Sequence, residues 1–201
     1  MYLPPKFKNE NRKQIQDLIR RHPFATVLTW GVGEEPFVNH LPLLVSDDGD
    51  FVVGHMSRRN PQWEQMRDGA KVKAIFHGPH AYITPTWYVS GRDVPTWNYA
   101  VVHVEGAVRL IESAEGLIDL LTRMTQAFEN DRSKPWAFEL PSDLKDPSSL
   151  EKAIVGFEIK ISNVQAKFKL GQNRPDADRE AVKRGLEAES SCTAKEMLRW
   201  L

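Results

Sequence analysis

Short runs of apolar and β-branched residues, separated by turn signals, dominate the first half of the chain. These runs predict strands over 25–30, 37–45, 51–55, 72–76, 81–83 and 99–111. Ser46 to Asp50 is a hairpin signal between two of the runs. Gly78-Pro79 is expected to interrupt the strand that begins at 72. Later, residues 155–161 alternate apolar and charged side chains, which predicts a strand with one buried face.

Helical periodicity is confined to a few segments, whereas most strands follow one another directly. The pattern predicts helices over 11–21, 61–67, 113–128 and 176–189. Strands joined by hairpins favour antiparallel pairing, and a closed or partly closed barrel buries many hairpins economically. We therefore expect a mainly β fold with peripheral helices, of the α+β class. Residues 1–165 would form a barrel domain with helix 113–128 inserted, and residues 166–201 a C-terminal helical extension packed on it.

Composition narrows the classes of function. The 201 residues carry 27 Lys and Arg and 27 Asp and Glu, so the formal net charge is zero and no basic excess indicates nucleic acid. The one cysteine, Cys192, excludes an intrachain disulfide, and no apolar run reaches membrane-spanning length. The N-terminal residues have neither the apolar core nor the cleavage site of a signal peptide. We expect a cytoplasmic protein without membrane contact.

The stretch from Gly54 to Trp63 carries the strongest chemical signal. The apolar run 51–53 stops at Gly54, and Ser57, Arg58 and Arg59 then supply hydroxyl and guanidinium donors before Asn60. Donors gathered at a strand end, just before a helix N-terminus, are typical of a phosphate site. A solvated turn in which Asn60 caps the following helix explains the same residues equally well.

A second candidate segment is the loop from Thr84 to Asn98. Trp87 and Trp97 offer flat apolar faces among small polar donors, which suits a planar heteroaromatic ligand. The alternative is that these aromatic side chains pack a subunit interface. No P-loop, G-x-S-x-G, H-E-x-x-H or C-x-x-C motif occurs, so neither a metal site nor a catalytic residue is assigned.

Several motifs together resemble one known family. His40-Leu41-Pro42-Leu43, Gly54 to Trp63, Pro95-Thr96-Trp97-Asn98-Tyr99 and Lys167-Phe168-Lys169-Leu170-Gly171-Gln172-Asn173-Arg174 resemble the PaiB-type FMN-binding negative transcriptional regulators. The resemblance runs over essentially the whole chain. It implies a homodimeric, antiparallel split β-barrel of the FMN-binding type, similar to pyridoxamine-phosphate-oxidase-like flavoproteins.

The resemblance also implies which residues bind the cofactor. In that superfamily a Ser-Arg-Lys segment before an Asn-Pro turn holds the FMN phosphate, and Ser57-Arg58-Arg59 matches it with Arg59 in place of Lys. The oxidase pattern has a Gln where Val101 stands, so the oxidase activity is not carried over. The expected FMN-binding residues are His55, Met56, Ser57, Arg58, Arg59, Asn60, Trp87, Trp97 and Asn98.

Two classes of function follow. The first is a dimeric FMN-binding protein that represses transcription and is not an enzyme. Its direct contact with DNA is left open, because the basic residues between Lys167 and Arg184 are mixed with acidic ones. The second is a flavin-dependent oxidoreductase or FMN reductase that does not bind DNA. Haem in the same cleft is a third interpretation, with His40, His55 or His103 as axial ligand.

Overall fold

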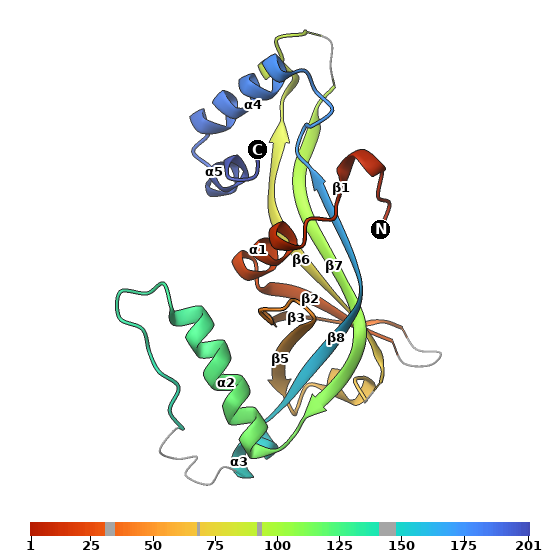
Figure 1. Cartoon of the computed structure of the whole chain (residues 1–201), viewed down its shortest axis with the longest axis vertical. Coiled ribbons are helices and arrows are strands. Elements are labelled where there is room, and N and C mark those ends of the chain that lie inside the picture. The colour runs from red at the N-terminus through yellow and green to blue at the C-terminus, as the bar shows by residue number, and fades with distance from the viewer. Residues whose placement is uncertain (31–34, 68, 92–93, 141–147) are drawn as a thin grey trace. The chain divides into compact units, whose positions relative to one another are not determined.

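A computed structural model describes the whole chain except residues 31–34, 68, 92–93 and 141–147 (Figure 1). The strands are β1 (Lys8–Asn9), β2 (Phe24–Thr29), β3 (Phe37–Pro42), β4 (Leu44–Val45), β5 (Phe51–Ser57), β6 (Lys71–Ile83), β7 (Thr96–Ile111) and β8 (Ile154–Lys169). The α-helices are α1 (Arg12–Arg21), α2 (Ala114–Glu129), α3 (Ser148–Ala153), α4 (Asp176–Ala188) and α5 (Cys192–Leu198). Short 3₁₀ helices are η1 (Pro5–Phe7), η2 (Pro61–Gln65) and η3 (Pro85–Trp87).

The strands form one eight-stranded sheet in the order β3-β2-β6-β7-β8-β5-β4, with β1 paired to β8. Antiparallel ladders fix the register, for example Thr26 opposite His40 and Gly54 opposite Phe157. Strands β3 and β5 contact each other, but no ladder joins them in the described part of the chain. The sheet is therefore not closed, and the predicted α+β fold with an antiparallel split barrel is confirmed.

The contacts divide the chain into two compact units. The first unit comprises Met1–Arg21, His77–His103 and Gln165–Leu201, and the second comprises His22–Phe76 and Val104–Val164. The long strands β6, β7 and β8 run from one unit into the other. The segment that the sequence predicts as a C-terminal extension belongs to the first unit together with the N-terminal segment.

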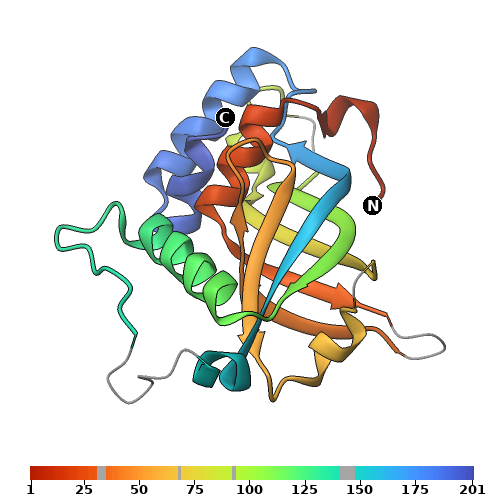
Figure 2. The same cartoon turned by 60° about the horizontal axis from the view of Figure 1, so that its bottom comes forward.

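In the second unit, α2 packs on the strands β5 and β8 (Figure 2). Val53, Leu120 and Met124 form a buried cluster there. The helix begins where the sequence predicts, because the Ser113 hydroxyl accepts a hydrogen bond from the Gly116 amide at 3.3 Å. A Cβ atom at Gly156 would lie 2.7 Å from the Leu120 side chain, so only glycine lets the helix approach β8 this closely.

In the first unit, α4 and α5 pack beside the end of β6. Ile83, Tyr88, Val182, Leu186 and Met197 belong to this buried cluster. The two amides of Val89 and Ser90 donate to the Asp178 carboxylate at 2.8 and 3.0 Å, and the Ser90 hydroxyl donates at 2.8 Å. These bonds fix the segment after η3 against the first turn of α4.

The expected interruption at Gly78-Pro79 is wrong, since β6 continues through it to Ile83. The ladder between β2 and β6 ends at Phe76, so the missing N–H of Pro79 costs no bond of that ladder. A Cβ atom at Gly78 would lie 2.9 Å from both the Ala100 carbonyl oxygen and the Leu18 side chain. Gly78 therefore permits a close approach instead of ending the strand.

Candidate functional site

The segment from Ser57 to Asn60 lies at the end of β5 in the second unit. The Asn60 side chain accepts a hydrogen bond from the Gln62 amide at 3.1 Å and caps η2. The buried Gln62 side chain donates to the carbonyl oxygens of Val27 and Phe37, both at 3.1 Å. The Gln62 side chain thus ties η2, which follows this segment, to β2 and β3. The cap that Asn60 was expected to form is present.

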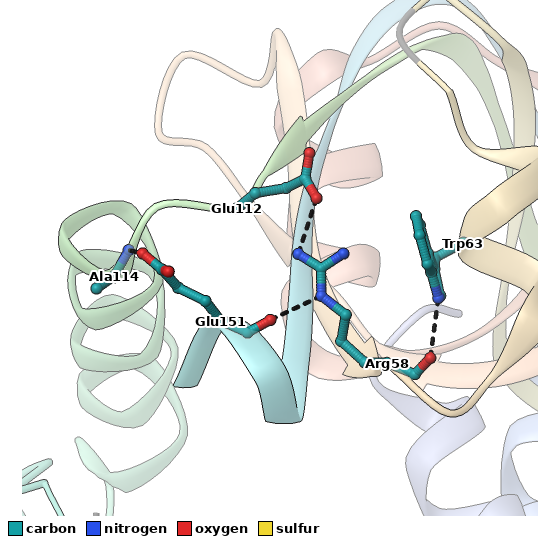
Figure 3. Close-up of polar contacts among 5 residues, drawn as sticks. All are labelled: Arg58, Trp63, Glu112, Ala114 and Glu151. Atoms are coloured by element: carbon teal, nitrogen blue, oxygen red, sulfur yellow. Dashed lines mark hydrogen bonds and ion pairs between the residues drawn. The ribbon is translucent and has the colours of Figure 1, made fainter. Parts of the chain in front are cut away.

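Arg58 is held by three neighbours in the same unit (Figure 3). Its Nε donates to the Glu151 carbonyl oxygen and its Nη2 to the Glu112 carboxylate, each at 2.8 Å. The guanidinium lies 5.0 Å from the centroid of the Trp63 ring, and the Trp63 Nε1 donates to the Arg58 carbonyl oxygen at 3.0 Å. Arginine carries five N–H donors. Within the described part of the chain, the bonds to Glu151 and Glu112 use two of these donors and leave three for a ligand.

The other predicted residues of this segment differ in how they face solvent. Met56 is buried in the core, whereas Ser57 and Arg59 are exposed. No hydrogen bond or ion pair joins the Arg59 guanidinium to the residues that the structure describes. His55 is half-buried, and its Nδ1 has no hydrogen-bond partner among the described residues. Burial lowers the pKa of His55, which favours the neutral imidazole.

Trp87, Trp97 and Asn98 lie in the first unit. Trp87 packs on α4, where a Cβ atom at Gly185 would come within 2.3 Å of its ring. Trp97 is 52% exposed, and its ring centroid lies 6.0 Å from those of His80 and Tyr82. The Asn98 side chain is buried. The predicted site residues therefore fall into two groups, one in each unit.

The first unit also contains a cavity of about 210 Å³ that the sequence reasoning did not assign to a ligand. Five residues of the Lys-Phe-Lys-Leu-Gly-Gln-Asn-Arg motif line it, namely Lys169, Leu170, Gly171, Asn173 and Arg174. Asn98 is the one predicted site residue among the described lining residues. In the sequence, this cavity is indicated only by basic and amide side chains that cluster directly after a predicted strand.

Among the residues that the structure describes, no group of three or more His, Cys, Asp and Glu side chains is placed to hold a metal ion. No helix in this part of the chain is both long and apolar enough to cross a membrane.

Comparison with known sequences places the chain among flavin-related proteins. The family model described as "Putative FMN-binding domain" matches residues 1–163. The chain is 39% identical over 199 residues to the "Protease synthase and sporulation protein PAI 2" of Bacillus subtilis (strain 168). The match covers 98% of this chain and 94% of that protein.

Comparison with solved structures gives matches to the fold. The FAD and heme binding protein from Mycobacterium smegmatis matches with a TM-score of 0.64 and 18% identity, over 89% of this chain and 80% of that one. The flavocytochrome Anf3 from Azotobacter vinelandii matches with a TM-score of 0.63 and 14% identity, over 87% of this chain and 75% of that one. At these identities the similarity shows the fold alone.

Proposed function

Because the chain belongs to the FMN-binding domain family and is a homologue of the Bacillus PAI 2 protein, we propose that it is a homodimeric FMN-binding repressor of the PaiB type. The family predicted from the sequence motifs is confirmed. FMN is confirmed as the cofactor at the level of the family. The observation that carries the proposal is the match to an FMN-binding family over residues 1–163, which includes the donor segment at the end of β5.

The proposed phosphate contacts come from Ser57, Arg58 and Arg59. Three N–H groups of Arg58 remain after its internal bonds, and the guanidinium of Arg59 is exposed. Guanidinium groups suit phosphate because several N–H donors can address several phosphate oxygens. The neighbouring Asn60 positions the turn by capping η2. When bound, FMN supplies redox chemistry, while these residues bind and orient it.

The proposed dimer rests on an exposed aromatic group in the first unit. Trp97 is 52% exposed and Tyr82 is 49% exposed, and their rings meet edge to face. Large aromatic side chains are enriched at protein interfaces. The predicted contacts of Trp87, Trp97 and Asn98 with the flavin ring remain part of this proposal. Sedimentation velocity of the wild type and of Trp97→Ser tests the dimer, because a monomeric wild type would contradict it.

Flavin titration tests the phosphate contacts. Among the described residues, the Arg59 side chain has no hydrogen-bond or ion-pair partner, so the fold of Arg59→Ala should be unchanged while its affinity for FMN falls about tenfold. Arg67→Ala removes an exposed arginine just beyond η2 and is the matched control for net charge. Quenching of flavin fluorescence measures both affinities. Equal affinities for FMN in the two variants would place the phosphate away from Arg59.

A gel shift with a panel of genomic promoter fragments tests repression by direct contact. Binding should weaken steeply with added salt, because phosphate contacts release counterions. Absence of a shift at low salt, together with oxidation of NAD(P)H by the FMN-loaded protein, would instead assign the oxidoreductase function.

A further inference from the structure

Positive charge collects around the cavity of the first unit. Five basic residues line it, and no Asp or Glu occurs among its described lining residues. They are Lys6, Lys169, Arg174, Arg179 and Lys183. Ile83, Tyr88 and Val182 contribute apolar surface to the same cavity. The lining thus combines a cationic part with an apolar part.

The turn after β8 positions Arg174, one of these five basic residues. Gly171 has a φ of +79°, a conformation that favours glycine. The Gln172 side chain closes the turn, because its Nε2 donates to the Phe168 carbonyl oxygen at 2.6 Å and its Oε1 accepts from the Leu170 amide at 2.8 Å. Arg174 follows, and its guanidinium lies 4.8 Å from the centroid of the Tyr88 ring. The turn is therefore a fixed part of the cavity wall.

Among the described residues, the hydrogen-bond partners of Lys169 are neutral acceptors. Its Nζ donates to the Trp97 carbonyl oxygen at 2.8 Å and to the Thr96 hydroxyl. Burial lowers the pKa of Lys169 most, and the positive charges of Lys167 and Arg174 lower it further. An anion in the cavity would reverse the effect of these charges and favour the protonated amine.

Helix α4 contributes another part of the lining. Arg179 and Lys183 are four residues apart and share one face of the helix. Their ion pairs with Asp176 and Glu180 involve carboxylates that are 96% and 59% exposed, and exposed pairs of this kind are weak. The buried carboxylate of α4, Asp178, is already bonded by Val89 and Ser90.

Asn98 contributes a neutral amide to the same lining. Its side chain is 3% exposed, and its Nδ2 would lie 3.8 Å from a Cβ atom at Gly171. The cavity therefore offers an amide group beside the basic side chains.

We propose that this cavity binds a small organic anion, a phosphate or carboxylate group on an apolar body, as a ligand additional to the flavin. The volume of about 210 Å³ lies below the range of roughly 300–1,000 Å³ common for larger ligands, so the ligand is small. The concave, partly apolar lining fits a small molecule better than the backbone of a DNA duplex. None of the described lining residues belongs to the proposed flavin phosphate site at Ser57–Arg59, and Asn98 alone among them is also a proposed contact of the flavin ring.

Calorimetric titration of the full chain with phenyl phosphate, inorganic phosphate and phenol tests the proposal. Phenyl phosphate should bind more tightly than either of the others, because it alone uses both the charge and the apolar surface. Arg179→Ala combined with Lys183→Ala should weaken its binding at least about tenfold. The matched control combines Arg184→Ala with Lys195→Ala, two exposed basic residues outside the described lining, and should change the affinity less than about twofold.

Four results would overturn the proposal. The first is no saturable binding of phenyl phosphate by the wild type, and the second is equal weakening in the control variant. The third is competition between FMN and phenyl phosphate, which would make the cavity part of the flavin site. The fourth is loss of DNA binding in the α4 variant while phenyl phosphate binding is unchanged. Thermal unfolding of each variant checks that it is folded, and Lys6→Ala, at an exposed lining residue outside the proposed flavin contacts, then provides an independent test through reduced phenyl phosphate affinity.

Discussion

Replacing Arg58 separates its structural contribution from its proposed contact with phosphate. Arg58→Ala removes the bond to the Glu151 carbonyl, the ion pair with Glu112 and the contact with the Trp63 ring. The side chain of Arg58 is only 21% exposed, so the bond to Glu151 is the largest of these contributions, about 1.5–3 kcal/mol. The pair with Glu112, whose side chain is 53% exposed, adds less than about 1 kcal/mol. We expect a loss of about 2–3 kcal/mol in the free energy of unfolding, measured by urea denaturation.

The same variant should lose FMN affinity by roughly 2 kcal/mol, or about 30-fold, because a charge-assisted bond to the phosphate is removed. Glu112→Gln provides the opposite test. It weakens the hold on one Arg58 N–H and removes a negative charge beside the proposed phosphate. FMN affinity should therefore be unchanged or higher, while stability falls by less than about 1 kcal/mol.

Fluorescence titration with FMN, at a temperature where urea denaturation finds each variant folded, gives the two affinities. If Arg58→Ala destabilises the protein but binds FMN as tightly as the wild type, Arg58 is a packing residue and the phosphate lies elsewhere. If Glu112→Gln weakens FMN as much as Arg58→Ala does, the carboxylate contributes to the site and the assigned geometry is wrong.

Two further predictions follow from close contacts in the fold. Hydrogen bonds from Ser90 and Val89 lower the pKa of Asp178, so the stability that this carboxylate contributes is present above the unfolded pKa and is lost as the pH falls through the lower folded pKa. Asp178→Asn should therefore reduce the fall of the melting temperature at acid pH. An unchanged fall would contradict this. Gly106→Val places a Cβ atom 2.1 Å from the Lys160 carbonyl oxygen and should lower the free energy of unfolding by about 3 kcal/mol or more, whereas Ala107→Val at the exposed neighbouring position should have little effect in the same urea titration.

Local patterns predicted the elements whose signals are contained in a few neighbouring residues. Ser113 begins α2 and Asn60 caps η2, because a cap is a contact over two or three residues. A glycine inside the predicted strand 99–111 likewise marks a close approach, since a Cβ atom at Gly106 would meet the backbone of β8. The family motifs identified the cofactor class without any geometry.

Features that depend on distant residues were not predictable in this way. The partners of Arg58 lie 93 and 54 residues away along the chain, at Glu151 and Glu112. The continuity of β6 through Pro79 depends on where its ladder with β2 ends. The basic cavity combines residues from η1, β8 and α4, so no single segment of the sequence predicts it.

Discrimination between FMN and riboflavin tests most directly whether the β5 end holds the phosphate, because the two flavins differ only by that group. The ratio of their dissociation constants should favour FMN by about tenfold or more in the wild type and should fall close to one when Arg58 and Arg59 are both replaced by Ala. Equal affinity of the wild type for both flavins, or an unchanged ratio in the double variant, would contradict the account.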